Sequence, residues 1–264
     1  GPATVHAMTE AERRVYADRA AWLGDPDFFK VPVEALTDKA YSEKRMLSFD
    51  PDKATPSSAV KEGDPLPAES PETTHLSVVD QHGNAVAVTT TLNDSYGAAV
   101  VVAGSGFFLN DEMDDFSIKP GQPNMYGVIG GEANKIAPNK RMLSSMTPTI
   151  VEQNGKLFMV LGTPGGSTII TSVFQTILNV IEYNMTMQES VSAKRIHSQW
   201  LPEVVFPEKG ALKKSDSSRL VRMGHRFHDD YLDGIGRVDA ILVRPDGTLE
   251  GGADPRGDDT AVGW

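Results

Sequence analysis

The sequence predicts an α+β fold, in which antiparallel strand pairs combine with separate amphipathic helices. Segments 73–79 and 85–91 are rich in β-branched and small polar residues, and the turn residues Asp-Gln-His-Gly-Asn separate them. This arrangement predicts a β-hairpin. Segments 149–151 and 157–161 flank Asn154-Gly155, a strong signal for a type I′ turn, and predict a second hairpin.

Helices are predicted where apolar residues recur every three or four positions. The clearest helix spans 169–181, whose apolar residues form one continuous stripe. Good helix formers and a partial apolar stripe that includes Val15 and Trp22 predict a helix over 4–23. Gly24-Asp25-Pro26 ends that helix, because proline cannot continue it. Weaker signals predict helices over 33–47, 187–197 and 216–223 and strands over 98–103, 238–243 and 248–250.

The chain is organised around the first strand of the first hairpin. In this strand Thr73, His75 and Ser77 alternate with Leu76 and Val78. Side chains in a strand point to opposite faces in turn. The alternation therefore predicts a buried face with the apolar residues and a polar face with the others.

Thr73 is a candidate nucleophile. A threonine hydroxyl needs a base, and an N-terminal threonine uses its own α-amine for that purpose. Thr73 acquires such an amine only if the Glu72–Thr73 bond is cut. The proline-rich segment 51–71 before it has the composition of an extended surface linker, which tolerates a break. The alternative is that the two threonines merely begin a β-rich segment.

The composition is that of an ordinary globular protein. The 264 residues are 39% hydrophobic and 23% charged, and the net charge is −11. Nucleic acid and anionic membrane surfaces are therefore disfavoured as partners. We expect no membrane span and no signal peptide in these residues. Cysteine is absent, and the six histidines show no metal-ligand spacing.

An acidic cluster over 111–115 precedes a long segment, 119–131, that has neither helical nor strand period. The cluster is either a solvated loop or a site for a cation or a substrate ammonium group. A loop as long as 119–131 in a compact domain is often a lid or a binding loop.

A glycine pair, Gly165-Gly166, lies between a predicted buried strand and the amphipathic helix. Backbone N–H groups at such a helix start bind anions, either a phosphate or the oxyanion of an acyl transfer. No lysine follows the second glycine, so phosphate is the weaker interpretation. The alternative is that the glycines only permit a tight turn.

Taken in order, these stretches resemble the γ-glutamyltranspeptidases, N-terminal-nucleophile hydrolases that cut their own precursor. The likeness runs through nearly the whole chain. The matching pieces are Tyr16-Ala17-Asp18-Arg19, 23–26, Thr73-Thr74-His75, 89–93, 113–116, 138–141, 143–146, 162–167 and Asp254-Pro255-Arg256.

The resemblance implies a role for each site residue. Thr73 is implied to be the nucleophile, freed by autocatalytic cleavage after Glu72, and Thr91 to hydrogen-bond its hydroxyl. Gly165 and Gly166 are implied to form the oxyanion hole. The implied substrate contacts are Asn93, Glu112 and Asp115 for the α-ammonium of the glutamyl group, Ser144 and Ser145 for its α-carboxylate, and Tyr126 as a lid.

The implied reaction transfers a γ-glutamyl group from glutathione or a similar donor to water, an amino acid or a peptide, without a cofactor or metal. Two alternatives remain. In one, the chain is an inactive or uncleaved fragment that only binds or assembles. In the other, the enzyme acts on a different amide, such as a cephalosporin side chain or poly-γ-glutamate.

The implied fold is a four-layer αββα sandwich, with antiparallel sheets between helical layers. Residues 1–72 correspond to the C-terminal part of a large subunit, a helix plus the proline-rich linker, and residues 73–264 to the small catalytic subunit. Most of the large subunit is then missing, including an arginine that pairs with the substrate carboxylate. A heterodimer with that remainder and a periplasmic or secreted location are also implied.

Overall fold

The computed structural model describes residues 1–60, 72–229 and 232–263. Its chain divides into two compact units, each assembled from three segments. Unit 1 comprises 1–69, 112–144 and 196–232, and unit 2 comprises 70–111, 145–195 and 233–264. These units do not follow the predicted boundary at Glu72, which concerns cleavage and stays a prediction.

Unit 2 contains two antiparallel sheets and two helices. The first sheet is the hairpin of β1 (Glu72–Val79) and β2 (Ala85–Asn93), and the second has the strand order β3-β4-β7-β8. The remaining elements are β3 (Thr149–Gln153), β4 (Lys156–Gly162), β7 (Asp239–Val243), β8 (Leu249–Gly252), α4 (Thr168–Tyr183) and α5 (Met187–Ser192).

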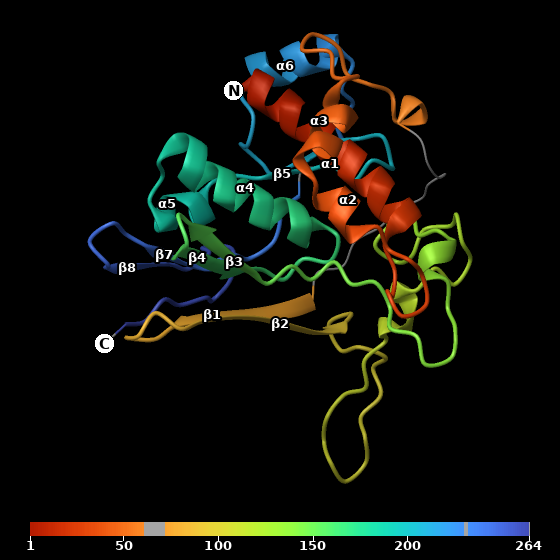
Figure 1. Cartoon of the computed structure of the whole chain (residues 1–264), viewed down its shortest axis with the longest axis vertical. Helices are drawn as coiled ribbons and strands as arrows, with labels where there is room; N and C mark the ends of the chain where they lie inside the picture. The colour runs from red at the N-terminus through yellow and green to blue at the C-terminus, as the bar shows by residue number, and fades with distance from the viewer. Residues whose placement is uncertain (61–71, 230–231, 264) are drawn as a thin grey trace. The chain divides into compact units, whose positions relative to one another are not determined.

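These elements of unit 2 form three layers. The β1–β2 hairpin packs against β4 and β7, and α4 and α5 cover the opposite face of the second sheet (Figure 1). Between this sheet and the helices lies an apolar core that includes Met159, Leu161, Val173 and Val191. The helix–sheet–sheet order confirms the α+β class.

The first hairpin forms as predicted, but the prediction for its two faces is wrong. His75 is buried, whereas Leu76 is 59% exposed and Val78 is also exposed. Leu76 pairs with Val88 and Val78 with Val86, so four apolar side chains share one open face. The polar face is the one that packs on the second sheet, where its side chains hydrogen-bond to one another.

The second hairpin confirms the turn prediction. Asn154 and Gly155 have φ values of 55° and 71°, as a type I′ turn requires at both central positions. The predicted helix over 169–181 is α4. The predicted strands over 238–243 and 248–250 are β7 and β8.

Unit 1 consists of helices, 3-10 turns and one short strand pair. Its elements are α1 (Pro2–Trp22), α2 (Val33–Thr37), α3 (Lys39–Met46), η1 (Ser57–Ala59), η2 (Glu112–Asp115), η3 (Glu132–Asn134), β5 (Ile196–His197), β6 (Phe206–Pro207) and α6 (Lys214–Met223). The predicted helix over 33–47 is two helices, because Asp38 is extended and its side chain caps α3 through the Tyr41 N–H.

Helix α1 buries a polar face rather than the predicted apolar stripe, and Val15 is 53% exposed. Glu10 accepts hydrogen bonds from Arg13 (3.1 Å) and Arg14 (2.7 Å), and all three side chains are buried. Buried charges are tolerated when they are paired and hydrogen-bonded. This pairing is why hydrophobic periodicity failed to identify the buried face.

The structure also bears on four other sequence predictions. Segment 98–103 is not a strand and contributes only an isolated bridge, because turns interrupt it on both sides. The helix predicted over 187–197 ends at Ser192, and its last residues form β5. Residues 61–71 of the linker predicted over 51–71 lie outside the described residues; in the described part Ala54, Ser57 and Val60 are buried, so it is not an extended surface segment. The helix predicted over 216–223 is α6, and it ends at Gly224 with a φ of 105°.

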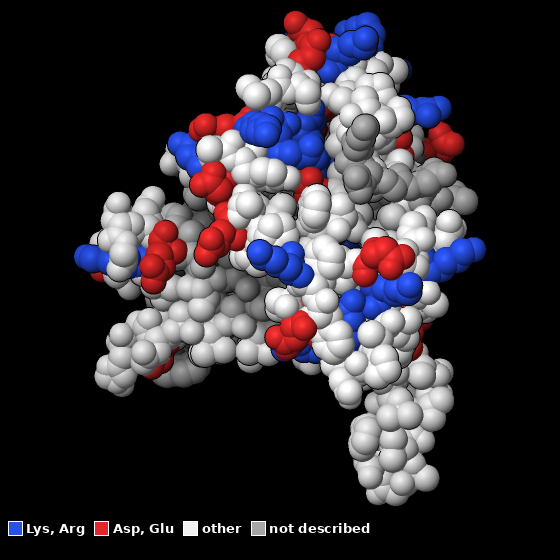
Figure 2. Space-filling model, turned by 45° about the vertical axis from the view of Figure 1, so that its right-hand side comes forward, with Lys and Arg blue, Asp and Glu red and all other residues white. Residues whose placement is uncertain are grey.

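The surface in view in Figure 2 carries lysine, arginine, aspartate and glutamate in small groups of both signs. Across the parts of the chain that are described, no helix has the length and apolar character needed to cross a membrane.

Candidate functional site

The hydroxyls of Thr73 and Thr91 meet across the β1–β2 hairpin. The two residues are direct cross-strand partners, and Thr73 Oγ1 donates a hydrogen bond to Thr91 Oγ1 at 3.2 Å. Antiparallel pairing places such partners on the same face. The predicted contact between these two hydroxyls is therefore present in the structure.

A β-bulge lies beside this pair. The strand register shifts between Glu72 and Thr73, so that Glu72 pairs with Asn93 while Thr73 pairs with Thr91. Asn93 is buried, has a φ of 78°, and donates its backbone N–H to Thr91 Oγ1 at 2.9 Å. The irregularity thus falls on the peptide bond that the resemblance marks for cleavage. Bulges are enriched beside active sites, where they change the direction of a side chain.

His75 fixes the same face of the hairpin, a role that the sequence did not reveal. Its ring contacts Thr89 Oγ1 at 2.8 Å and Ser77 Oγ at 2.9 Å. Ser77 donates its only proton to the Asp239 carbonyl, so it accepts from His75 Nε2–H. His75 Nδ1 is then the acceptor for the Thr89 hydroxyl.

His75 also connects β1 to β4. A Cβ on Gly162 would lie 2.2 Å from His75 Cε1, so only glycine allows the ring to sit against β4. Gly162 is three residues before Gly165. The polar alternation of Thr73, His75 and Ser77, facing Thr89 and Thr91, is the sequence feature that could have indicated this buried polar layer.

We expect His75 to make stability depend on pH. Burial lowers its pKa from 6.5 to about 4, so between these pH values His75 is protonated in the unfolded chain but neutral in the folded chain. The stability from His75 is complete above pH 6.5 and is lost as the pH falls toward 4. His75→Asn should therefore destabilise most at pH 7, and this deficit should shrink by on the order of 2 kcal/mol at pH 4.5. Urea denaturation at both pH values measures the difference.

The comparison must be made between parent and variant at each pH. Burial and the nearby Asp259 and Asp254 raise the pKa of Asp239 to about 7, which acts in the opposite direction. His82→Asn, in the exposed turn of the same hairpin, is the control. A deficit for the His75 variant that does not change with pH would contradict the assignment.

Gly165 and Gly166 form the turn that leads into α4. Their φ values are 138° and 53°, and a Cβ on Gly165 would lie 2.6 Å from Thr168 Oγ1. Both carbonyls accept N–H groups from the first turn of α4. Within the described residues, neither glycine amide donates a hydrogen bond, so both amides are available to an anion.

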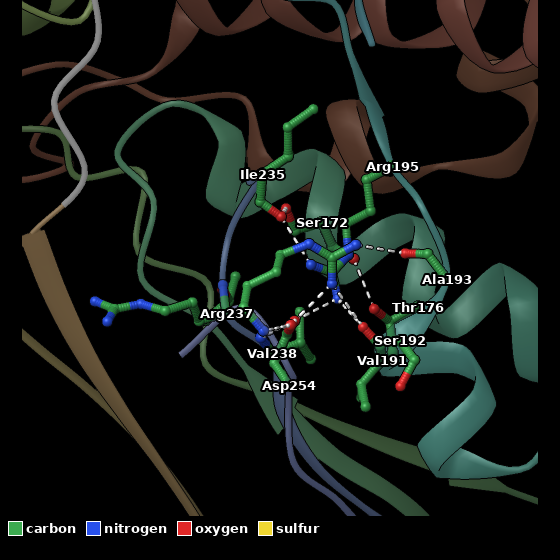
Figure 3. Close-up of polar contacts among 12 residues, drawn as sticks. Ser172, Thr176, Val191, Ser192, Ala193, Arg195, Ile235, Arg237, Val238 and Asp254 are labelled. Atoms are coloured by element: carbon green, nitrogen blue, oxygen red, sulfur yellow. Dashed lines mark hydrogen bonds and ion pairs between the residues drawn. The ribbon is translucent and has the colours of Figure 1, made fainter. Parts of the chain in front are cut away.

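A buried ion-pair network of Arg195 and Asp254 holds segment 235–238 (Figure 3). Asp254 Oδ2 accepts from Arg195 Nη2 and from the Val238 N–H, each at 2.8 Å. Arg195 Nη1 also donates to the Ile235 carbonyl at 2.7 Å. Segment 235–238 is thereby fixed, and the Arg237 N–H within it donates to Thr163 Oγ1 at 2.7 Å. The Asp254-Pro255-Arg256 motif thus acts on the glycine turn through segment 235–238.

The predicted ammonium ligands Glu112 and Asp115 lie in unit 1, on η2. Both are half-buried, so the acidic cluster is not a fully solvated loop. Asn134 Nδ2 donates to the Asp115 carbonyl at 2.7 Å, and Asp115 lines a pocket of about 240 Å³ together with Arg19. Burial lowers the pKa of Arg19, and the nearby Asp115 carboxylate opposes that shift.

The other predicted substrate contacts are also distributed between the units. Tyr126 is buried in unit 1, where its carbonyl accepts from Gln199 Nε2 at 3.2 Å. Ser144 ends a segment of unit 1, and Ser145 begins a segment of unit 2. Unit 2 thus carries Thr73, Thr91, Asn93, Ser145, Gly165 and Gly166, and unit 1 carries Glu112, Asp115, Tyr126 and Ser144. The convergence of the two sets on one substrate stays a prediction.

Unit 1 brings together one cluster that sequence spacing missed. Ligand-type atoms of His6, Glu10 and His225 lie within 4.8 Å of one another. His6 and His225 are hydrogen-bonded directly at 2.6 Å, and Glu10 is paired with Arg13 and Arg14. Two guanidinium groups beside Glu10 would repel a cation, so the cluster as arranged is a buried hydrogen-bond network.

Comparison with known proteins shows which family this chain resembles. The family model for γ-glutamyltranspeptidase matches residues 1–264. A glutathione hydrolase proenzyme of Escherichia coli (strain K12) is 49% identical over 259 residues, which are 97% of this chain and 44% of that protein. The chain thus spans less than half the length of this curated relative.

Solved structures show the same relationship. A mutant γ-glutamyltranspeptidase of Helicobacter pylori is 52% identical, with a TM-score of 0.67 over 70% of this chain and 100% of that chain. A cephalosporin acylase of Bacillus halodurans, 23% identical, has a TM-score of 0.82 over 100% of this chain and 45% of that chain, which shows the fold alone. The chain belongs to the γ-glutamyltranspeptidase family.

Proposed function

We propose that this chain supplies the nucleophile and the oxyanion turn of an enzyme that transfers the γ-glutamyl group of glutathione and related amides. The observation that carries the proposal is the hydrogen bond between the Thr73 and Thr91 hydroxyls beside the bulge at Glu72–Thr73. Cleavage of that bond would give Thr73 a free α-amine next to its own hydroxyl. An N-terminal threonine of this kind needs no other base.

The reaction has two acyl-transfer steps. Thr73 Oγ1 attacks the γ-carbonyl carbon, and its proton passes through the α-amine to the leaving amine as the amide bond breaks. The product is a γ-glutamyl ester on Thr73. Water or an acceptor amine then attacks this ester, and the oxygen of Thr73 recovers its proton.

Gly165 and Gly166 are suited to stabilise the oxyanion in both steps. Their unused amides stand before the N-terminus of α4, where the helix dipole favours negative charge. Loss of one such donor typically costs roughly 2.7–4 kcal/mol of transition-state stabilisation. His75 against Gly162, and the Arg237 N–H bonded to Thr163, hold the end of β4 and the residue after it, which lead into this turn.

The glutamyl group would be recognised by its own charges. Glu112 and Asp115 offer carboxylates to the α-ammonium, with the Asn93 amide as a third contact. Ser144 and Ser145 offer hydroxyls to the α-carboxylate, and Tyr126 would cover the bound group. Charge-assisted hydrogen bonds of this kind are stronger than neutral ones.

A large subunit is the proposed partner. The E. coli relative is more than twice as long as the matched region, and its name describes a proenzyme. The open face formed by Leu76, Val78, Val86 and Val88 is an apolar surface of the kind that a further layer covers. Such a layer would complete the four-layer αββα sandwich. We also propose a periplasmic or secreted location.

The test is to assay release from γ-glutamyl donors with the chain alone and again with a large-subunit fragment from a relative. The chain alone should be a poor enzyme, because a bidentate arginine for the α-carboxylate is expected from the partner. Added fragment should raise the activity. Cephalosporin amides and poly-γ-glutamate serve as comparison substrates. Full activity from a monodisperse monomer would contradict the proposal that a large subunit is required. A higher rate on a comparison substrate than on γ-glutamyl donors would contradict the γ-glutamyl assignment.

A further inference from the structure

Asn93 is the partner of Glu72 in the bulge beside the proposed cleavage bond, and Leu92 is the extra residue left without a cross-strand partner. In the register of the rest of the hairpin, Glu72 would pair with Leu92, but it pairs with Asn93 instead. The extra residue is accommodated by the left-handed backbone of Asn93, whose φ is 78°. Glycine and asparagine adopt this conformation most readily, whereas β-branched residues resist it.

The backbone of Asn93 is linked to the Thr73–Thr91 pair through the Thr91 Oγ1 atom. Its N–H donates to Thr91 Oγ1 at 2.9 Å, and the same oxygen accepts the Thr73 hydroxyl at 3.2 Å. A hydroxyl oxygen has two acceptor lone pairs. With one lone pair held by the Asn93 N–H, the other is directed to Thr73.

The side chain of Asn93 makes a separate contact. Its Nδ2 donates to the Asp111 carbonyl at 3.4 Å, and the side chain is buried. Backbone and side chain therefore act on different groups. A substitution can remove one without removing the other.

We propose that Asn93 is a positioning residue for cleavage, acting through its left-handed backbone, which sets the Thr91 hydroxyl and through it the Thr73 hydroxyl. This role rests on the proposed function, because it concerns the Glu72–Thr73 bond. It is independent of any contact between the Asn93 amide and substrate.

Two substitutions separate the roles. Asn93→Gly keeps the left-handed backbone and removes the amide, so cleavage before Thr73 should proceed at close to the parent rate. Asn93→Val disfavours the left-handed backbone and should slow cleavage by about ten-fold or more. The appearance of the new N-terminus, followed by mass spectrometry in the uncut protein, gives both rates without any substrate.

Asn184 provides the matched control. It is also an asparagine with positive φ, 52°, in unit 2, at the C-terminus of α4. Asn184→Val carries a similar backbone penalty and should leave the cleavage rate unchanged. If Asn93→Val does not fold, Asn93→Ala replaces it, with an intermediate slowing expected.

The outcomes distinguish the inference from the proposed function. A parent protein that never cuts before Thr73 contradicts the proposed function itself. If the parent cuts but Asn93→Val cuts equally fast, or Asn93→Gly is as slow as Asn93→Val, the backbone role is wrong and the function stands. If Asn184→Val slowed cleavage as much as Asn93→Val, the backbone role would also be wrong, because the slowing would then reflect a general loss of stability.

Discussion

Replacement of Thr73 by alanine is expected to abolish both cleavage before residue 73 and γ-glutamyl transfer. Both reactions require the same Oγ1 atom as nucleophile, and alanine removes it together with its hydrogen bond to Thr91 Oγ1. Gel electrophoresis and donor release measure the two losses.

Thr74→Ala is the matched control for this variant. Thr74 is the next residue of β1, and its side chain is exposed on the opposite face of the strand. Cleavage and transfer should both survive in Thr74→Ala. Normal cleavage of Thr73→Ala would exclude Thr73 as the nucleophile.

Replacement of Asp115 by asparagine is expected to weaken the binding of γ-glutamyl donors while cleavage continues. The change keeps the shape of the side chain and removes its charge. Loss of a hydrogen bond to a charged group costs about 1.5–3 kcal/mol, or roughly ten- to a hundred-fold in affinity. The KM for donors with and without the α-amine, measured in the assembled enzyme, gives the effect.

The control for Asp115 is its neighbour Asp114, whose Oδ2 accepts the Met125 N–H at 2.8 Å. Asp114→Asn should change donor affinity little. If Asp115→Asn had the same KM as the parent for donors with the α-amine and for donors without it, the acidic cluster would have only a structural role.

The parts of the fold that could be predicted from sequence are those set by local signals. Asn154-Gly155 determines a turn by its backbone preference alone, and the apolar stripe of α4 determines a helix. The burial of α1 could not be predicted in this way. Its inner face is held by Glu10 with Arg13 and Arg14, and partner residues as distant as Thr55 are not visible in a periodic pattern.

The orientation of the first hairpin shows the same limit. Alternation indicates that Leu76 and His75 lie on different faces, but not which face is covered. Hydrophobicity favoured burial of the Leu76 face, but the His75 face is the buried one, where His75 forms hydrogen bonds with Thr89 and Ser77.

The candidate site divides in a similar way. The contact between Thr73 and Thr91 follows from the hairpin, because eighteen residues and one tight turn separate them. Asp254 and Arg195 are 59 residues apart, and no local pattern indicates their pairing. Residue roles for Glu112, Ser144 and Tyr126 came only from the family resemblance, and they remain predictions.

The central claim is that Thr73 becomes an N-terminal residue. Intact mass and N-terminal sequencing of the purified mature protein test it most directly. We predict two chains, one of which begins Thr73-Thr74-His75. Active material that consists of a single uncut chain, or of a chain that begins at another residue, would contradict the account.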